Sequence, residues 1–450
     1  MKTPTQIRAL FDRLRPVAQA RAERRTRVLE AIAWPRHVED QFFARHAREL
    51  PEVEYDVDRE ATDARIVELQ GVLRAIDGDD PITEWARANL QSMIDANRLV
   101  RSMGTTEFHR ISRDLYGGSR TRFHGAGERN IDLAEHLLER LRIHGWDEAT
   151  DPEVEPVPAP AFAEELRQRI ARDLPGLEVD VVVDETATAK VVAGMTRVRV
   201  RAGATFTPWE AEGLWHHEVE THVLTAQNGA AQVEVPFLRA GGPRTTRTQE
   251  GLAVFTELYH HTLTVKRMER LAVRVKLVDM AEGGADFLDL YRYLLERGSA
   301  ARDAYLDAQR VCRGGRVEGG APFTKDAAYL AGLLDVNAFL AVMVRGGFRD
   351  EIELLVAGRI ALEDLHALVI LRRMGVLQRP SHLPVWLRRW NTLLPEFAFA
   401  SFLSDLSLDA LYKRQRSLIE DAASVQGPTD APPEMPPTMR APPLRDDHDD

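Results

Sequence analysis

The chain has 450 residues, of which 59 are Lys or Arg and 70 are Asp or Glu, so its formal net charge is −11. This acidic balance argues against a general nucleic-acid-binding protein. The single cysteine, Cys312, excludes an internal disulfide framework, and we expect it to be a structural residue in a protein of the reducing cytoplasm. We expect no signal peptide, because the N-terminus lacks an apolar run of about 7–15 residues. We expect no membrane span, because no apolar run reaches about 18 residues.

Residues 1–145 are predicted to be an N-terminal helical region. Apolar residues recur at helical spacing in Asp58–Ile76, Ile82–Met103 and Asn130–Ile143. The Arg-rich segment Arg8–Ile32 is interpreted as a solvated helix face rather than an RNA-binding arm, because acidic residues interrupt its positive charge. Residues 146–162, rich in Pro, Glu and Asp, are predicted to be a linker.

Residues 163–420 are predicted to be the catalytic domain, which begins with a helical pattern over Glu164–Asp173 and continues with strand signals. Leu177–Val183 and Thr196–Arg201 are the predicted strands. Arg and Val alternate along the second one, which indicates one buried face and one wet face. An edge strand at this place could hold an extended substrate peptide as an added strand. A plain hairpin that only packs against the next helix fits the pattern equally well.

A delimited helix follows these strands. Thr207 is a suitable N-cap, Pro208 suits the first helical position, and Glu210 completes a capping box. Asn228-Gly229 predicts the end of the helix, because glycine commonly follows a helical C-terminus. The predicted helix therefore covers about Pro208–Gln227.

The middle turns of this helix carry the segment Trp215–His222, in which His217-Glu218 and His222 form an HExxxH motif. On an ideal helix, residues five apart point about 140° away from each other, so the two histidines could not face one ion. A π-bulge, with its i→i+5 hydrogen bond, would bring both onto one face, and such bulges are frequent at functional sites. We therefore predict a π-bulge between His217 and His222.

The two histidines are candidate zinc ligands, and Glu250 is the candidate third ligand. Glu250 begins a second helical pattern after the loop Gly241–Pro243, and the small residues Gly251 and Ala253 would let this helix pack closely on the first. Two His and one Glu plus water is the usual catalytic set, so we expect about one zinc ion per chain. Glu218 would be the general base that takes a proton from the metal-activated water.

The motif by itself is a weak signal. A chain with 14 histidines can produce HExxxH by chance, and a helical pair of histidines is more often packed or solvated than bound to metal. Three neighbouring features favour the metal site: the capped helix, the strands directly before it, and the segment Gln249–Ala253 after it.

Three segments together carry a resemblance to a known family: His216–His222, Gln249–Ala253 and Phe323–Leu330. They resemble the bacterial QEGLA-motif proteins, often labelled flavohaemoglobin expression-modulating proteins. The same family includes the eukaryotic microtubule-associated tyrosine carboxypeptidases, zinc enzymes that remove the C-terminal tyrosine of α-tubulin. The resemblance covers roughly Pro35 to Lys413.

This resemblance implies that His217, His222 and Glu250 bind zinc and that Glu218 is the catalytic glutamate. The chain departs from the family pattern at Glu220, where we expect a small residue such as glycine. A carboxylate beside the site would add negative charge, and it could disturb activation of the water or act as a stray ligand.

A carboxypeptidase also needs a cation for the terminal carboxylate and a donor for the tetrahedral oxyanion. Arg313 or Lys325 could supply the cation, and Tyr329 the donor. Lys325 and Tyr329 are four residues apart and share a helical face; the alternative is a surface lysine with a core tyrosine. His260-His261 are predicted to be surface residues without a metal role.

The predicted fold class is α+β and mainly helical, a gluzincin-like metallopeptidase with a small β-sheet beside the active-site helix. Residues 425–450 are predicted to be a disordered acidic, Pro-rich tail. The predicted activity is zinc-dependent carboxypeptidase chemistry on a peptide or protein C-terminus, with no nucleic acid or membrane as partner. The alternative is a regulatory binding protein with a structural or vestigial metal site. The intact Glu218 discriminates between them, because a structural site needs ligands but no base.

Overall fold

The computed structural model describes residues 2–19, 28–123, 127–141, 155–187 and 189–404. The chain divides into two compact units, Met1–Pro395 and Glu396–Asp450, and only the first nine residues of the second are described. The predicted N-terminal helical region and most of the predicted catalytic domain are parts of the first unit. The predicted tail and residues 146–154 of the predicted linker lie outside the described residues.

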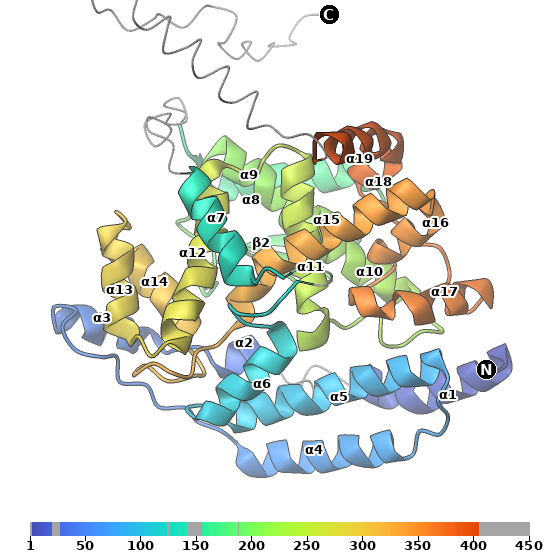
Figure 1. Ribbon diagram of the computed structural model, residues 1–450, viewed down its shortest axis with the longest axis horizontal. Helices are drawn as coiled ribbons and strands as arrows, with labels where there is room; N and C mark the ends of the chain where they lie inside the picture. Colours follow the sequence, from blue (N-terminus) through green and yellow to red (C-terminus); the bar gives the residue numbers. More distant parts are fainter. Residues whose placement is uncertain (1, 20–27, 124–126, 142–154, 188, 405–450) are drawn as a thin grey trace, which may run out of the picture. The chain divides into compact units, whose positions relative to one another are not determined.

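The described chain is mainly helical with a few short strands, as the predicted class requires (Figure 1). Among the described residues, the helices before the HExxxH motif are α1 (Pro4–Ala18), α2 (Val28–Ala31), α3 (Arg36–Ala44), α4 (Arg59–Arg74), α5 (Pro81–Arg101), α6 (Thr106–Tyr116), α7 (Asn130–Leu141) and α8 (Ala159–Asp173). The motif and its neighbours form α9 (Pro208–Leu214), the π-helix η2 (Trp215–Val223), α10 (Leu224–Ala231) and α11 (Pro243–Tyr259). The rest of the chain forms α12 (Val265–Glu282), α13 (Phe287–Glu296), α14 (Ala301–Cys312), the 3₁₀ turn η3 (Lys325–Ala327), α15 (Ala328–Gly346), α16 (Arg349–Ile352), the 3₁₀ turns η4 (Glu353–Val356) and η5 (Leu362–Asp364), α17 (Leu365–Arg373), α18 (Val385–Arg388) and α19 (Trp390–Ser404).

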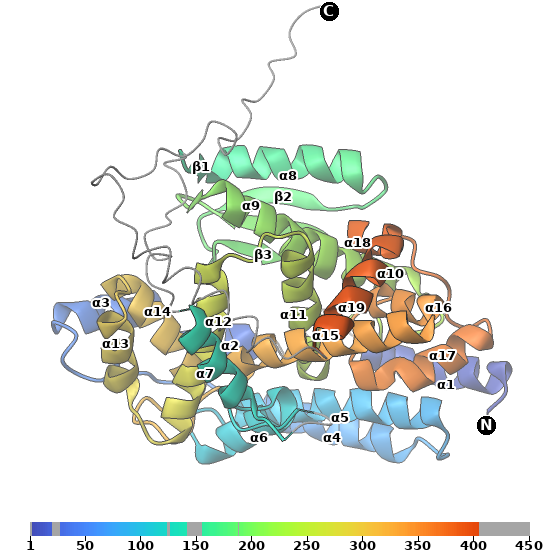
Figure 2. The same cartoon turned by 45° about the horizontal axis from the view of Figure 1, so that its top comes forward.

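The strands form two small sheets. They are β1 (Val157–Pro158), β2 (Asp180–Asp184), β3 (Val191–Ala193), β4 (Arg197–Arg201) and β5 (Thr205–Phe206). β1 pairs with β5, while β4 lies between β2, to which it is parallel, and β3, to which it is antiparallel. Val198 and Val200 of β4 are buried, which confirms the predicted alternation. α8 packs along β2 (Figure 2).

The placement of β4 corrects the expectation of an edge strand at Thr196–Arg201. β4 is paired on both sides, so it has no free edge to offer a peptide. The strand that contacts η2 is β3, which lies at one edge of the sheet. Any added strand beside the motif helix would therefore pair with β3.

The N-terminal helices pack into the same core as the later ones. Trp34 and Phe42 are buried among the side chains of α13 and α14. The ring of Phe42 lies 5.3 Å from that of Phe287 and 5.1 Å from that of Tyr305. Buried Cys312 belongs to this aromatic cluster, which agrees with a structural role.

The start of the motif helix is as predicted, with one difference. Thr207 Oγ1 accepts from the backbone N–H of Glu210 at 3.1 Å, and Pro208 occupies the first helical turn. The carboxylate of Glu210 does not close the capping box; it pairs with Lys190 Nζ at 2.7 Å. The lysine cation is here the stronger partner for this partly exposed carboxylate.

The predicted stop at Asn228-Gly229 is wrong, because the helix continues to Ala231. Asn228 instead ties the helix to distant loops, since its side chain donates to the carbonyl oxygens of Val356 and His382. Gly229 is required because a Cβ there would overlap the backbone of Leu238. Both residues serve tertiary packing rather than helix termination.

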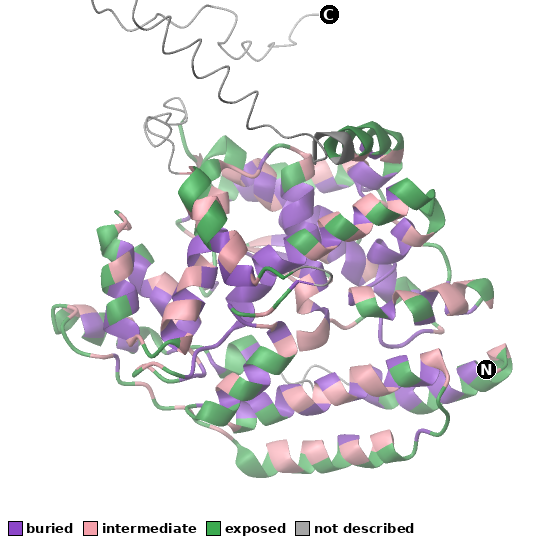
Figure 3. Ribbon diagram, in the orientation of Figure 1, coloured by how far each residue is buried: buried purple, intermediate pink, exposed green. Residues whose placement is uncertain are grey.

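α11 lies between η2 and α15, and it contacts both. α11 and the first half of α15 are mostly buried, whereas α4 buries only Leu69 (Figure 3). Gly251 of α11 meets Gly332 of α15 so closely that a Cβ on Gly251 would overlap the backbone of its partner. The expectation that Gly251 permits close packing on the motif helix is therefore corrected: the close approach is to α15.

The segment Lys325–Gly346 is long and apolar enough to cross a membrane by length and composition, although no long apolar run was expected. Over half of its most apolar window is buried inside the protein. Packing against α11 accounts for this composition, because a helix that is apolar on most sides suits the core of a large unit.

Replacing Gly251 by Ala should destabilise the protein by about 3 kcal/mol or more, because the backbones of two helices must separate to admit the methyl group. Thermal and denaturant unfolding would measure this. Gly71→Ala is the matched control, since Gly71 lies in α4 with open space around it and should gain about 0.5–1 kcal/mol in helix stability. Equal stability of the two variants would contradict the packing described for α11 and α15.

Candidate metal centre

The motif helix is widened where the two histidines lie. α9 passes directly into the π-helix η2, which continues as α10. The π-bulge predicted between His217 and His222 is thus confirmed. The two imidazole rings have centroids 5.0 Å apart and planes at 85°. Thr221 supports the wide turn, because its Oγ1 donates to the carbonyl oxygen of His216, five residues earlier, at 2.9 Å.

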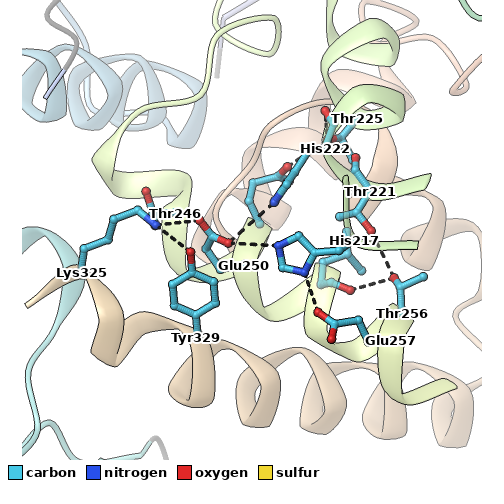
Figure 4. A network of polar contacts seen from close by, with 12 residues as sticks. His217, Thr221, His222, Thr225, Thr246, Glu250, Thr256, Glu257, Lys325 and Tyr329 are labelled. Carbon is cyan, nitrogen blue, oxygen red and sulfur yellow. Dashed lines mark hydrogen bonds and ion pairs between the residues drawn. The ribbon is translucent and has the colours of Figure 1, made fainter. Parts of the chain in front are cut away.

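Glu250 of α11 faces both histidines (Figure 4). Its Oε2 lies 3.6 Å from His217 Nε2 and 3.7 Å from His222 Nε2, and the ligand atoms of the three residues all lie within 4.8 Å of one another. Ligand atoms at about 2.0–2.2 Å from a tetrahedral zinc ion are roughly 3.3–3.6 Å apart. Two imidazole nitrogens and a carboxylate oxygen at these separations fit zinc after small shifts.

His217 is held from behind by a carboxylate. Its Nδ1 donates to Glu257 Oε1 at 2.6 Å, which directs Nε2 toward Glu250. Arg267 in turn donates to both oxygens of Glu257 at 3.1 Å. Such a carboxylate orients a metal-binding histidine and raises its basicity. Glu257 was not identified from the sequence, although its position seven residues after Glu250, on the same face of α11, is a signal that could have found it.

The charges around the site shift the pKa values of these groups. Burial alone would lower the pKa of His217, but Glu250 and Glu257 outweigh burial and raise it to about 10. Burial would raise the pKa of Glu250, but Lys325 and the two histidines hold it well below its ordinary range. Burial likewise opposes ionisation of Glu257, whose pKa Arg267 and His217 lower to about 2. Both carboxylates are therefore ionised at neutral pH, as ligands and their partners need to be.

Lys325 and Tyr329 lie on the other side of Glu250 (Figure 4). Lys325 Nζ donates to Glu250 Oε1 at 2.8 Å and to the hydroxyl oxygen of Tyr329 at 3.2 Å. Both side chains are buried, so the alternative of a surface lysine is wrong. Because Lys325 engages Oε1, the other oxygen of Glu250 remains directed at the histidines.

Glu218 and Arg313 make fewer contacts. Glu218 is partly exposed and, in the part of the chain that the structure describes, has no hydrogen bond or ion pair. Its charge contributes to the raised pKa of His217. The guanidinium of Arg313 lies 5.8 Å from the ring of Phe323, and its buried Nε has no acceptor among the residues that the structure describes. Burial, and then the charge of Arg310, lower the pKa of Arg313 to about 10.

Glu220 points away from this centre, so the expectation of a carboxylate beside the zinc ligands is wrong. Its Oε2 lies 2.6 Å from His216 Nδ1, and its Oε1 accepts from the backbone N–H of Val385 at 2.9 Å. The reason is helical position, since His216 and Glu220 share a face that His217 does not. His260 is not the surface residue that was predicted either: its ring stacks on that of His216, with centroids 3.7 Å apart.

Residues 40–405 match the family described as microtubule-associated tyrosine carboxypeptidase. The chain belongs to this family. The match includes α4 to α7 as well as every residue of the centre described above, so the tyrosine carboxypeptidase family shares most of the N-terminal helical region. A comparison with curated proteins gives no match.

Replacing Glu257 by Gln should weaken zinc binding about 10–100-fold, because the amide no longer fixes the imidazole as a charged acceptor does. Competition with a chelator of known affinity would measure this. Glu135→Gln is the control, since Glu135 is an exposed carboxylate paired with Lys276 and should leave zinc affinity unchanged. Unchanged zinc affinity in both variants would show that Glu257 does not support the ligand His217.

Proposed function

We propose that this member of the tyrosine carboxypeptidase family is a zinc-dependent peptidase that releases a residue from a peptide or protein C-terminus in the cytoplasm. The observation that carries the proposal is the meeting of His217, His222 and Glu250 across the π-helix and α11. We expect about one zinc ion at this centre. When bound, it would act as a Lewis acid on the scissile carbonyl and lower the pKa of a water molecule.

Glu218 is the proposed general base. It directly follows His217, and its partly exposed carboxylate has no competing hydrogen bond among the described residues. A free carboxylate at this position can accept a proton from the attacking water and pass it to the leaving amine. A structural site, as in the alternative of a regulatory binding protein, would have no use for such a group.

Tyr329 is the proposed donor to the tetrahedral oxyanion. Lys325 can only donate, so the contact between them occupies a lone pair on the hydroxyl oxygen of Tyr329 and leaves its proton for another acceptor. Since Lys325 also binds Glu250, its main proposed role is to hold that ligand. The terminal carboxylate of the substrate is then assigned to Arg313, whose Nε has no acceptor within the described part of the chain.

Replacing Glu218 by Gln should reduce peptide hydrolysis by about 10²–10⁴-fold, because the amide cannot accept the proton. Zinc content and melting temperature should barely change, since no ligand and no packing contact is altered. His222→Ala is the comparison variant, and it should lose zinc and activity together. Turnover, metal analysis and thermal unfolding on both variants separate the two effects.

Full turnover in Glu218→Gln would contradict the role of Glu218 as general base, whereas absence of hydrolysis by the unaltered, zinc-loaded protein would favour the binding protein. Loss of zinc in the same variant would instead indicate that Glu218 and His222, four residues apart, are the ligand pair.

Amidation of a substrate's C-terminus should lower kcat/KM by about 10–100-fold, because it removes the charge that a buried guanidinium would bind. Cleavage of matched acid and amide peptides, followed by mass spectrometry, would measure this. Acetylation of the N-terminus is the control and should have little effect. Equal cleavage of acid and amide peptides would rule out carboxypeptidase polarity while leaving the metal site intact.

A further inference from the structure

A second cluster of side chains that could bind a metal ion lies on a different face of the motif helix from His217 and His222. It consists of His216, Glu220 and His260, whose ligand atoms all lie within 4.8 Å of one another. We propose that these three residues form a second binding site for a divalent transition-metal ion, with zinc as its natural occupant. The site is separate from the centre of His217 and His222, and it does not depend on the peptidase activity.

The ligand atoms of the two histidines lie around one carboxylate oxygen of Glu220. Glu220 Oε2 lies 2.6 Å from His216 Nδ1 and 3.7 Å from His260 Nε2. Glu220 and His216 are almost completely buried, and His260 is mostly buried. Two imidazoles and a carboxylate are the ligand types that zinc takes in open three-residue sites. An ion at this place would replace the hydrogen bond between Glu220 and His216.

The support behind the ligands repeats that of the first centre. His216 Nε2 lies 3.0 Å from Glu212 Oε1, and Arg169 of α8 donates to both oxygens of Glu212. In the first centre, Glu257 likewise contacts His217 Nδ1, and Arg267 donates to Glu257. A carboxylate on the far nitrogen fixes the tautomer and aims the near nitrogen at an ion.

One ring nitrogen of His260 has no role in the hydrogen-bond network of the described residues, and metal binding would give it one. Its Nε2 is buried and has no hydrogen-bond partner among the described residues. The ring lies parallel to that of His216, with an angle of 5° between the planes, so both rings present edges to the same side chain, Glu220. An unpaired nitrogen in a buried position is costly for a hydrogen-bond network alone. A small tilt of the two rings would direct both nitrogens at a shared ion.

Such an ion would join segments that are far apart in sequence. His216 and Glu220 belong to η2, whereas His260 follows directly after α11, the helix that also carries Glu250. Glu220 Oε1 additionally accepts from the backbone N–H of Val385 in α18. The second ion would therefore fix the end of α11 against the motif helix, with a structural rather than a catalytic effect.

The test is a count of bound zinc. Protein stripped of metal is dialysed against buffered zinc, and bound zinc is measured by elemental analysis. We expect about two ions per chain in the unaltered protein. His260→Ala and Glu220→Gln should each bind about one fewer, as should His222→Ala from the first centre, and the double variant His222→Ala/His260→Ala should bind almost none. His136→Ala, which removes an exposed histidine of α7, is the control and should retain both ions.

Cobalt titration of the unaltered protein keeps the proposal testable if a variant fails to fold, since two sites give an absorption endpoint at about two equivalents. Circular dichroism identifies such a variant. The proposal is overturned if the unaltered protein saturates at one ion that His222→Ala removes. It is also overturned if folded His260→Ala and Glu220→Gln both keep the second ion. Loss of the second ion with the first retained supports it whether or not the protein hydrolyses peptides.

Discussion

The contact between the π-helix η2 and α11 is the constraint on which the polar interior of this protein depends. The two helices are held together by buried hydroxyl groups, with Thr221 Oγ1 3.3 Å from Thr256 Oγ1. Every proposed ligand lies on one of these helices or directly after its end. A π-turn changes which side chains share a face, and the adjacent residues His216 and His217 lie on different faces of the helix. One helix pair can therefore present two separate groups of donors.

α11 is positioned from its other side by α15. The glycine pair Gly251 and Gly332 lets the two backbones touch, and this close approach fixes how far Glu250 reaches toward the histidines. The same helix contact brings Lys325, at the turn before α15, against Glu250 Oε1. The residues of the QEGLA motif thus act together, since the glycine sets the distance at which the neighbouring glutamate can work.

Three buried or partly buried carboxylates of this region are each paired with a cation. Glu250 contacts Lys325, Glu257 contacts Arg267, and Glu212 contacts Arg169. A buried carboxylate without such a partner would take up a proton or destabilise the fold, because desolvation of an unpaired ion costs several kcal/mol. The arrangement keeps carboxylates ionised inside the protein, which is the state in which they can bind a cation or orient a histidine.

The sequence by itself determined the features that depend on local spacing. The cap at Thr207, the alternation in β4 and the five-residue interval between His217 and His222 each act within a few residues, so a strand, a helix start and a π-turn followed from the pattern alone. The choice of Glu250 as partner of the two histidines also agrees with the geometry. The first three predictions succeeded because caps, strand alternation and helical faces are set by neighbours in the chain, whereas the meeting of Glu250 with the histidines is a contact between two helices.

Only the tertiary structure decided which partners meet across distance. Gly229 was predicted to end a helix, but its small size instead permits contact with the backbone of Leu238. Glu220 was predicted to lie beside the metal ligands, but its carboxylate contacts His216 and Val385. The stacking of His260 on His216 joins residues that no local pattern connects. Such contacts depend on how helices pack, and that packing is a property of the whole core rather than of any one segment.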